Sequence, residues 1–225
     1  APDSRFSHLA IGCNPQTNKN IWLERVDDRQ YAEATKDNGG TGLSATDPEL
    51  DAIFGNFTKE VQQYGNLDTK TRLMITLASN IASQAQTEYR MMLESALNAG
   101  ITPIEIKEIL YQAVAYLGIG MVYPFLNIMN RHVNKPLKSA STTNRDNRIE
   151  LGNEKQCELF GEHMRGFQTS GPEEERHIKR WLAGNCFGDN YTRIGLTGAQ
   201  REMITFCFLA ALGTEPQLKS HKALK

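Results

Sequence analysis

An internal repeat constrains the fold of this 225-residue chain more than any other feature of its sequence. The stretch from Leu196 to His221 reproduces the layout of the stretch from Leu67 to Met92, and the two lie 129 residues apart. Similarity at a fixed spacing indicates that one structural unit is present more than once. The matched pairs are Arg72 with Arg201, Met74 with Met203, Ile75 with Ile204 and Thr76 with Thr205.

Apolar residues recur at helical spacing in both copies, and capping signals mark the helix starts. Asp68 is expected to cap one helix, and Thr102-Pro103-Ile104-Glu105 is a capping box with proline at the first helical position. No strand-like alternation of useful length occurs, so the predicted fold class is all-α, a helical bundle. The expected helices are residues 47–65, 68–82, 86–99, 102–117, 124–132, 149–164, 172–183, 197–211 and one that opens at 214–217, with a loop at 184–195.

The domain organisation follows from changes in composition along the chain. Residues 1–46 are polar, lack periodicity and are expected to form an N-terminal extension. Residues 134–146 are rich in Ser, Thr and Asn, as is typical of a surface linker. The sequence therefore predicts a first repeat at 47–133, a linker at 134–148 and a second repeat at 149–225.

Charge and cysteine spacing exclude several classes of function. The net charge is −1 and the pI is near 6.6, so nucleic acid and anionic membrane surfaces are poor partners. The four cysteines form no CxxC pair or Cys/His cluster, and no metal site is expected. The chain starts without methionine, which leaves its compartment open, with the cytoplasm favoured over an exported form.

The two copies differ at positions that could carry acid/base chemistry. The second copy has Glu202 and His221 at the positions of Leu73 and Met92 in the first copy. Histidine titrates near neutral pH, and a carboxylate beside it fixes its tautomer and increases its basicity. A tight antiparallel hairpin of the helices that carry Glu202 and His221 is expected to bring the two side chains within hydrogen-bond reach. We therefore expect His221 to act as an acid/base residue that Glu202 orients.

Two motifs together resemble the carboxymuconolactone decarboxylase and AhpD-like family. One is the stretch ALNAGITPIEIKEILYQ at 96–112, and the other is the spacing of Glu202, Thr214, Gln217 and His221. The resemblance covers residues 47–132 and 149–225 and implies a two-repeat helical fold and ring-like homo-oligomers, a trimer or a hexamer. The family normally continues past this histidine with a further helix, so the second repeat is expected to be truncated. Either a partner subunit or residues 1–46 complete the site, or the site is open and inactive.

The departures from the family pattern indicate which of its activities to expect. The AhpD-like peroxidases have a CxxC pair where this chain has Thr214 and Gln217, which cannot form a disulfide. The first copy, with Ala85, Glu88 and Met92 at the matching positions, is expected to be catalytically silent. The resemblance thus implies a decarboxylase that uses no cofactor and acts on a small carboxylated lactone or keto acid.

Arg201 is a candidate anchor for a substrate carboxylate, because a guanidinium binds a carboxylate through two hydrogen bonds. Its repeat partner Arg72 suggests instead a structural role that both copies share. Thr214 and Gln217 are candidate substrate contacts, although the Thr-x-x-Gln pattern also fits a structural capping box.

Two other functions remain open from the sequence. One is a non-catalytic helical oligomer that binds a small ligand, and it is favoured by a silent first copy and an incomplete second one. The other is a thiol peroxidase, in which Cys207 would have to be the reactive thiol although its helix is apolar.

Overall fold

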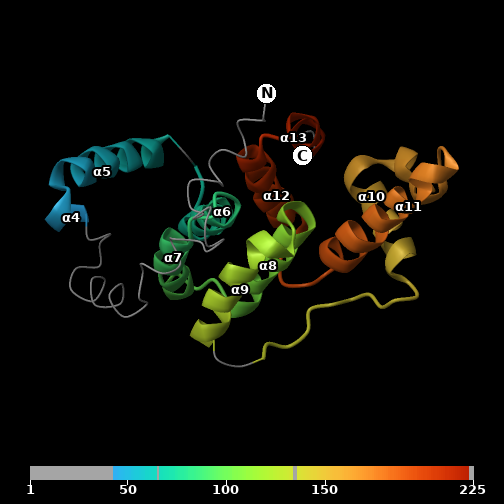
Figure 1. Cartoon of the computed structure of the whole chain (residues 1–225), viewed down its shortest axis with the longest axis horizontal. Coiled ribbons are helices and arrows are strands. Elements are labelled where there is room, and N and C mark those ends of the chain that lie inside the picture. Colours follow the sequence, from blue (N-terminus) through green and yellow to red (C-terminus); the bar gives the residue numbers. More distant parts are fainter. Residues whose placement is uncertain (1–42, 65, 134–135, 223–225) are drawn as a thin grey trace, which may run out of the picture. The chain divides into compact units, whose positions relative to one another are not determined.

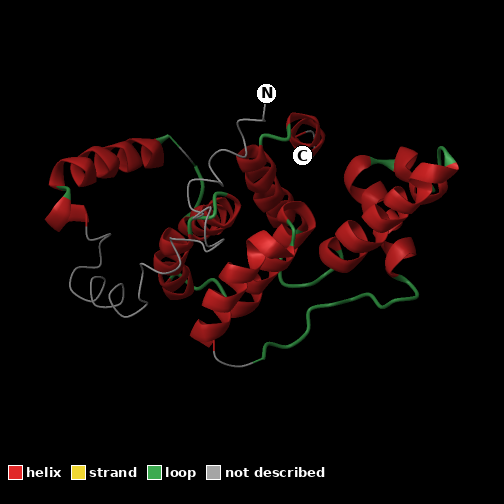
Figure 2. Cartoon of the chain, in the orientation of Figure 1, coloured by secondary structure: helices red, strands yellow, loops and turns green. Residues whose placement is uncertain are grey.

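The computed structural model describes residues 43–64, 66–133 and 136–222. All regular elements in these ranges are helices, which confirms the predicted all-α fold (Figure 2). The chain divides into two compact units, residues 1–66 and residues 67–225. The expected N-terminal extension lies outside the described residues, except for the short helix α4 (Leu43–Thr46).

In the first unit, helix α5 (Pro48–Gln63) begins with proline at its first position, as the sequence predicts. The aspartate before this proline, Asp47, does not cap the helix with its side chain. Asp47 has φ −138° and ψ 62°, and its side chain accepts no capping hydrogen bond. Its backbone carbonyl accepts instead from Asp51 N, at 3.0 Å.

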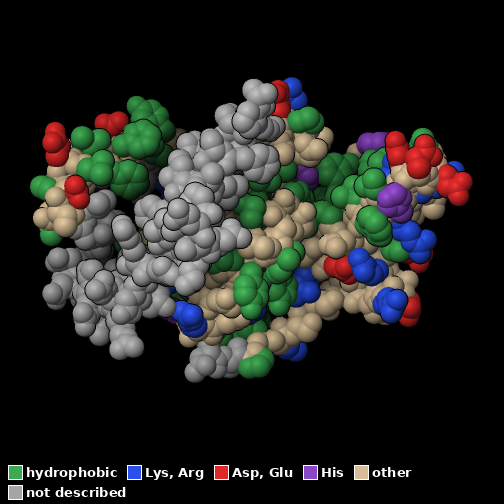
Figure 3. All heavy atoms as spheres, viewed as in Figure 1, with side chains coloured by type: hydrophobic (Ala, Val, Ile, Leu, Met, Phe, Trp, Pro, Cys, Tyr) green, Lys and Arg blue, Asp and Glu red, His purple; other side chains and the backbone are tan. Residues whose placement is uncertain are grey.

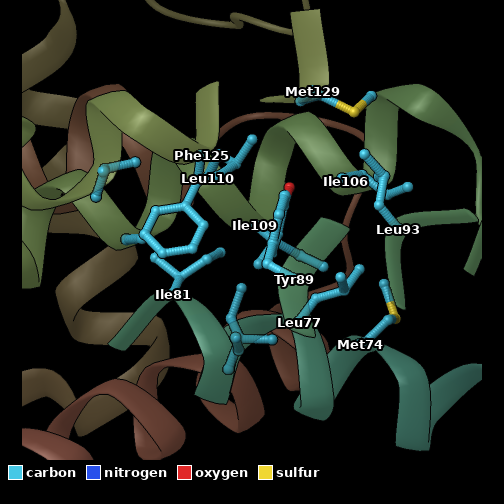
Figure 4. Packing of buried hydrophobic residues seen from close by; sticks show 14 of the residues in the cluster. Met74, Leu77, Ile81, Tyr89, Leu93, Ile106, Ile109, Leu110, Phe125 and Met129 are labelled. Atoms are coloured by element: carbon cyan, nitrogen blue, oxygen red, sulfur yellow. The ribbon is translucent and has the colours of Figure 1, made fainter. Parts of the chain in front are cut away.

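The second unit contains one large apolar core, built by α6 (Thr69–Ala82), α7 (Gln86–Asn98), α8 (Pro103–Leu117), α9 (Ile119–Val133) and α12 (Gly198–Leu212). Helix α12 packs against both α6 and α8, near the centre of Figure 1. Ile204 and Phe208 of α12 are fully buried in the same core as Leu77 and Ile109 (core packing in Figure 4). The predicted linker therefore lies within one unit, and the division into two repeats stays a prediction.

Three of the helix starts in this unit are fixed by side-chain caps that the sequence signals. Asp68 Oδ1 accepts from Thr71 N at 3.0 Å at the start of α6. Thr102 and Glu105 form a complete capping box at the start of α8, and Thr197 and Gln200 form another at the start of α12. These caps confirm the predicted starts to the residue or within one residue.

Helix α9 begins earlier than the sequence predicts. Gly118 (φ 79°) ends α8, but α9 starts at Ile119 and contains both Gly120 and Pro124. The expected start at Pro124 was wrong because a proline near the start of a helix removes only one backbone hydrogen bond, the bond to the Gly120 carbonyl. Gly120 is exposed, so water can take the place of that donor.

Residues 148–191 form a second group of helices. They are α10 (Arg148–Phe160), the 3₁₀ turns η2 (Glu162–Met164) and η3 (Phe167–Thr169), α11 (Glu173–Trp181) and the π-helix η4 (Leu182–Tyr191). The helix expected at 149–164 ends at Phe160, because Gly161 adopts φ 107°. The loop expected at 184–195 was wrong over most of its length, since residues up to Tyr191 are helical.

Glycines in η4 allow two backbones to touch and do not mark a loop. A Cβ atom on Gly188 would overlap the carbonyl oxygen of Arg148, and one on Gly152 would overlap that of Ala183. Helices α10 and η4 therefore pack backbone against backbone. The contact sets the relative positions of three aromatic residues, Phe160 on α10 and Phe187 and Tyr191 on η4.

Replacing Gly188 or Gly152 with alanine is expected to lower the free energy of unfolding by about 1–3 kcal/mol or more, because the backbones must separate. Urea denaturation followed by circular dichroism measures the loss. Gly198→Ala is the matched control, since a Cβ there meets open space at the first position of α12. Equal stability of the Gly188 and Gly198 variants would contradict the backbone contact.

Acidic side chains gather over α11, at the right-hand end of Figure 3. Glu173, Glu174 and Glu175 occupy its first turn, where negative charge complements the helix dipole. Among the described residues no group of three or more His, Cys, Asp or Glu side chains is placed to hold a metal ion. Within the same ranges, no helix is both long and apolar enough to cross a membrane.

Candidate active site

The hairpin of α12 and α13 (Glu215–Lys222) positions the two predicted acid/base residues. Gly213 ends α12 and reverses the chain in the left-handed conformation (φ 66°). Glu202 lies in the second turn of α12 and His221 near the end of α13. His221 Nδ1 and Glu202 Oε2 are 2.6 Å apart, so the structure has the contact that the prediction requires.

Both members of the pair are sheltered from solvent. The side chains of His221 and Glu202 are 9% and 12% exposed. Because a carboxylate only accepts hydrogen bonds, the proton of this contact belongs to Nδ1, and Nε2 is the basic nitrogen. The second oxygen, Glu202 Oε1, is buried and has no hydrogen-bond partner in the described ranges. This oxygen is therefore available to accept a hydrogen bond from a water molecule or a ligand.

Two aromatic rings hold the imidazole in place. Tyr116 of α8 and Phe160 of α10 both meet the His221 ring edge to face, with centroid distances of 6.0 Å and 5.5 Å. Phe160 is supported in turn by Phe187 of η4, at 5.8 Å. Such pairs fix ring orientation and exclude water. The histidine thus has a defined orientation set by four elements of the second unit.

Tyr191, the last residue of the π-helix, places a hydroxyl beside the pair. Its oxygen is 3.0 Å from the Tyr116 hydroxyl and 3.1 Å from Thr205 Oγ1. Burial, and then the negative charge of Glu202, raise the pKa of Tyr191 well above its usual value. Burial likewise raises the pKa of Tyr116. Both phenols are therefore protonated at neutral pH and can donate hydrogen bonds.

A polar row, defined as Glu108, Gln112 and Tyr116 of α8 with Arg201 and Thr205 of α12, crosses the core next to the pair. Gln112 Nε2 donates to Thr205 Oγ1 at 3.2 Å, and Arg201 Nη1 donates to Gln112 Oε1 at 3.2 Å. Arg201 Nη2 donates to Glu108 Oε2 at 2.9 Å. These three bonds all join α8 to α12, so they set how the two helices fit together.

Arg201 is placed in this row and away from solvent. Its side chain is fully buried, and Nη2 donates to the Arg193 carbonyl as well as to Glu108. A guanidinium held in this way has no exposed edge for a substrate carboxylate. The geometry therefore favours the structural role for Arg201 over the role of substrate anchor.

Thr214 and Gln217 lie at the start of α13, after the turn at Gly213, whereas Glu202 lies on α12 before that turn. The hydroxyl of Thr214 donates to the Leu209 carbonyl at 3.3 Å, and so tightens the turn after α12. Gln217 is exposed on α13. No side-chain hydrogen bond joins either residue to His221 or Glu202 in the described ranges, and their part in substrate binding stays a prediction.

The described cysteines are poor nucleophiles. Cys157 and Cys186 are buried and Cys207 is half-buried, while Cys13 lies outside the described residues. Burial raises the pKa of Cys186 from about 9 to about 12, and burial also raises that of Cys207. Cys186 Sγ donates to the Tyr116 hydroxyl at 3.7 Å. These thiols argue against a thiol peroxidase.

At pH 8, the thiolate fraction of Cys186 in the folded protein is expected to be about a thousandfold lower than in the unfolded chain, because its pKa is raised by about three units. Iodoacetamide labelling with peptide mapping, in buffer and in urea, measures the difference at each cysteine. The raised pKa also makes the unfolded state lose its proton first, so stability is expected to fall as the pH rises from about 9 to about 12. Fast labelling of Cys186 in buffer would contradict this environment.

Several residues around the pair were not singled out from the sequence. Phe160 and Tyr191 come from distant elements, and no local pattern indicates them. Glu108, Gln112 and Tyr116 did leave a signal, since they recur every four residues on α8 and so share one face. Arg201 and Thr205 have the same spacing on α12.

The candidate site can be set beside known proteins. No curated protein matches the chain, and no solved structure does. One family model matches residues 48–123, which is less than half of the chain and lies within the predicted first repeat. The match runs from α5 into α9 and does not include Glu202 or His221. Residues 48–123 are thus similar to the carboxymuconolactone decarboxylase family.

Proposed function

We propose that this protein is a cofactor-free acid/base lyase that decarboxylates a small carboxylated lactone or keto acid. The observation that supports the proposal best is the 2.6 Å contact between His221 Nδ1 and Glu202 Oε2, sheltered by aromatic rings. The family similarity of residues 48–123 is consistent with this reaction class.

The proposed chemistry needs a group that holds and returns one proton. When a carboxylate leaves as carbon dioxide from a position β to a carbonyl, the electron pair of the broken bond moves to the carbonyl and forms an enolate. The enolate then takes a proton at carbon. His221 would deliver this proton from Nε2, while Glu202 keeps the imidazole oriented and stabilises its charged form.

The test is an assay that does not require the natural substrate. The protein is incubated in D₂O with a panel of β-keto acids and carboxylated lactones, and NMR follows loss of the carboxylate and deuterium uptake at the adjacent carbon. The proposal expects both signals from at least one compound, at rates above buffer alone. Failure of every member of the panel to react faster than in buffer would count against the proposal.

A second candidate function is a helical protein that binds a small ligand without converting it. One observation favours it: the second unit has a pocket of about 380 Å³ that is lined by α8, residues 136–139 and Arg193, and neither Glu202 nor His221 lines it. Binding without turnover in the same NMR panel would support this alternative. A homo-oligomer, trimer or hexamer, is part of either proposal and is measured by sedimentation.

A further inference from the structure

The pocket of about 380 Å³ lies where the N-terminal half of α8 meets the segment 136–139 and Arg193. Its volume is within the range of small-molecule sites. All of its lining residues belong to the second unit of the chain. It is a defined concavity that the proposed decarboxylase chemistry does not use.

Positive charge dominates its lining. Lys107, Lys138 and Arg193 line the pocket together with one acid, Glu108. Glu108 is already neutralised, since both of its oxygens accept from Arg193 at 2.9–3.0 Å and Oε2 also accepts from Arg201. Three cations against one acid leave the lining with a net charge of +2, in a chain whose overall net charge is −1.

Two of these cations are held in position. Arg193 is clamped by Glu108, and its guanidinium lies 4.7 Å from the centroid of the Tyr111 ring. Lys107 Nζ donates to Asn130 Oδ1 of α9, and burial lowers the pKa of this lysine. An ammonium group has three N–H donors, so Lys107 keeps donors for a ligand. Preorganised cations lose little entropy when an anion binds.

Most of the remaining lining of the pocket is apolar. Ile104, Tyr111 and Leu137 are all half-buried there. An inorganic anion would use the cations and leave this wall against water. A small organic anion would use both, with its charged group on the cations and its hydrocarbon part on the apolar wall.

We propose that this pocket is a binding site for a small organic carboxylate, held by Lys107, Lys138 and Arg193. The site is separate from the Glu202–His221 pair. On α8, Glu108 lines the pocket and Tyr116 contacts His221. The two residues are eight positions, and thus about 12 Å, apart along the helix axis.

The test is a titration of the ¹⁵N-labelled full chain with benzoate at low ionic strength, followed by amide shifts of residues 107–111, 137–139 and 193. Benzamide is the uncharged probe of the same shape, and inorganic phosphate is the anion without an apolar part. The expected result is saturable shifts with benzoate, weaker ones with phosphate and none with benzamide. Added salt is expected to weaken benzoate binding, because charge attraction is screened.

Substitutions of single lysines test whether benzoate binds in this pocket. Lys138→Glu, on an exposed residue, is expected to weaken benzoate binding by about tenfold or more. Lys107→Met, which keeps the hydrocarbon stem, is expected to do the same. Lys219→Glu is the matched control for net charge, since Lys219 is 73% exposed on α13 and does not line the pocket. Its affinity for benzoate is expected to stay at the wild-type value.

Three results would overturn the proposal: no saturable shifts in these residues with benzoate, equal shifts with benzamide, or unchanged affinity in both the Lys138 and Lys107 variants. Phosphate binding stronger than benzoate binding would also reject an organic carboxylate as the ligand. A Glu202→Gln variant separates this proposal from the enzymatic one, since it is expected to bind benzoate normally whether or not the protein is a lyase.

Discussion

Replacing His221 with glutamine is expected to lower the rate of decarboxylation by about 100- to 10,000-fold, the usual contribution of a general acid/base residue. Glutamine fills a similar volume and can still donate to Glu202, but it cannot accept and return a proton at neutral pH. The KM is expected to change little, because the substitution removes the proton transfer and leaves the aromatic walls in place. Initial rates with the most reactive compound of the NMR panel measure both parameters.

The partner variant and a control make this result specific. Glu202→Gln removes the charge that orients and stabilises the imidazole, and a loss of about tenfold to a hundredfold is expected from removing a supporting partner. His163→Gln replaces an exposed histidine in η2 and is expected to keep the wild-type rate. If His221→Gln retained full activity with a folded circular dichroism spectrum, His221 would not be the acid/base group.

Replacing Glu108 with glutamine is expected to cost about 3–5 kcal/mol of folding free energy, because it leaves the buried guanidinium of Arg201 without a counter-charge. Burial alone lowers the pKa of Arg201, and the Glu108 carboxylate counteracts that effect. Arginine nevertheless stays protonated in proteins. In the variant, the charged Arg201 side chain must therefore either stay buried without a counter-charge or move into solvent. Urea denaturation at pH 7 measures the change.

A double variant distinguishes loss of charge balance from loss of packing. Glu108→Met with Arg201→Met removes both charges and keeps most of the volume, and it is expected to be more stable than Glu108→Gln alone. Glu158→Gln is the surface control, since that carboxylate is 64% exposed and pairs with Lys155 at the helix surface, so little change is expected. A Glu108 variant as stable as the Glu158 variant would show that the buried contact contributes little.

The parts of the fold that sequence predicted well are those with local chemical signals. Asp68 and Thr102 fix the starts of α6 and α8 through their own side chains, so their positions are readable within four residues of sequence. The π-helix η4 was not predictable in the same way. Its Gly188 resembles a loop residue until the neighbouring backbone of α10 is known, because the Arg148 carbonyl that requires its small size lies 40 residues earlier in the chain.

The candidate site likewise has parts that local sequence signals predict and parts that they do not. The Glu202–His221 contact was predictable because the hairpin that forms it is local, with Gly213 as its turn. The rings of Tyr116 and Phe160 were not, since only the packing of α8 and α10 brings them to the imidazole. Arg201 shows the opposite case. Its residue type suggested a ligand anchor and its repeat partner Arg72 a structural role, and its burial against Glu108 favours the structural role.

The polar row between α8 and α12 also determines how precisely Glu202, the residue after Arg201, is positioned. Apolar contacts tolerate a small slide or rotation of one helix on another, whereas a hydrogen bond weakens steeply when its angle or length changes. Advancing α12 by one residue would turn Arg201 by about 100° and detach it from Glu108 and Gln112 together. Glu202 is the next residue in the chain, so the bonds of Arg201 to Glu108 and Gln112 also fix the position and direction of the Glu202 carboxylate, although Glu202 takes no part in them.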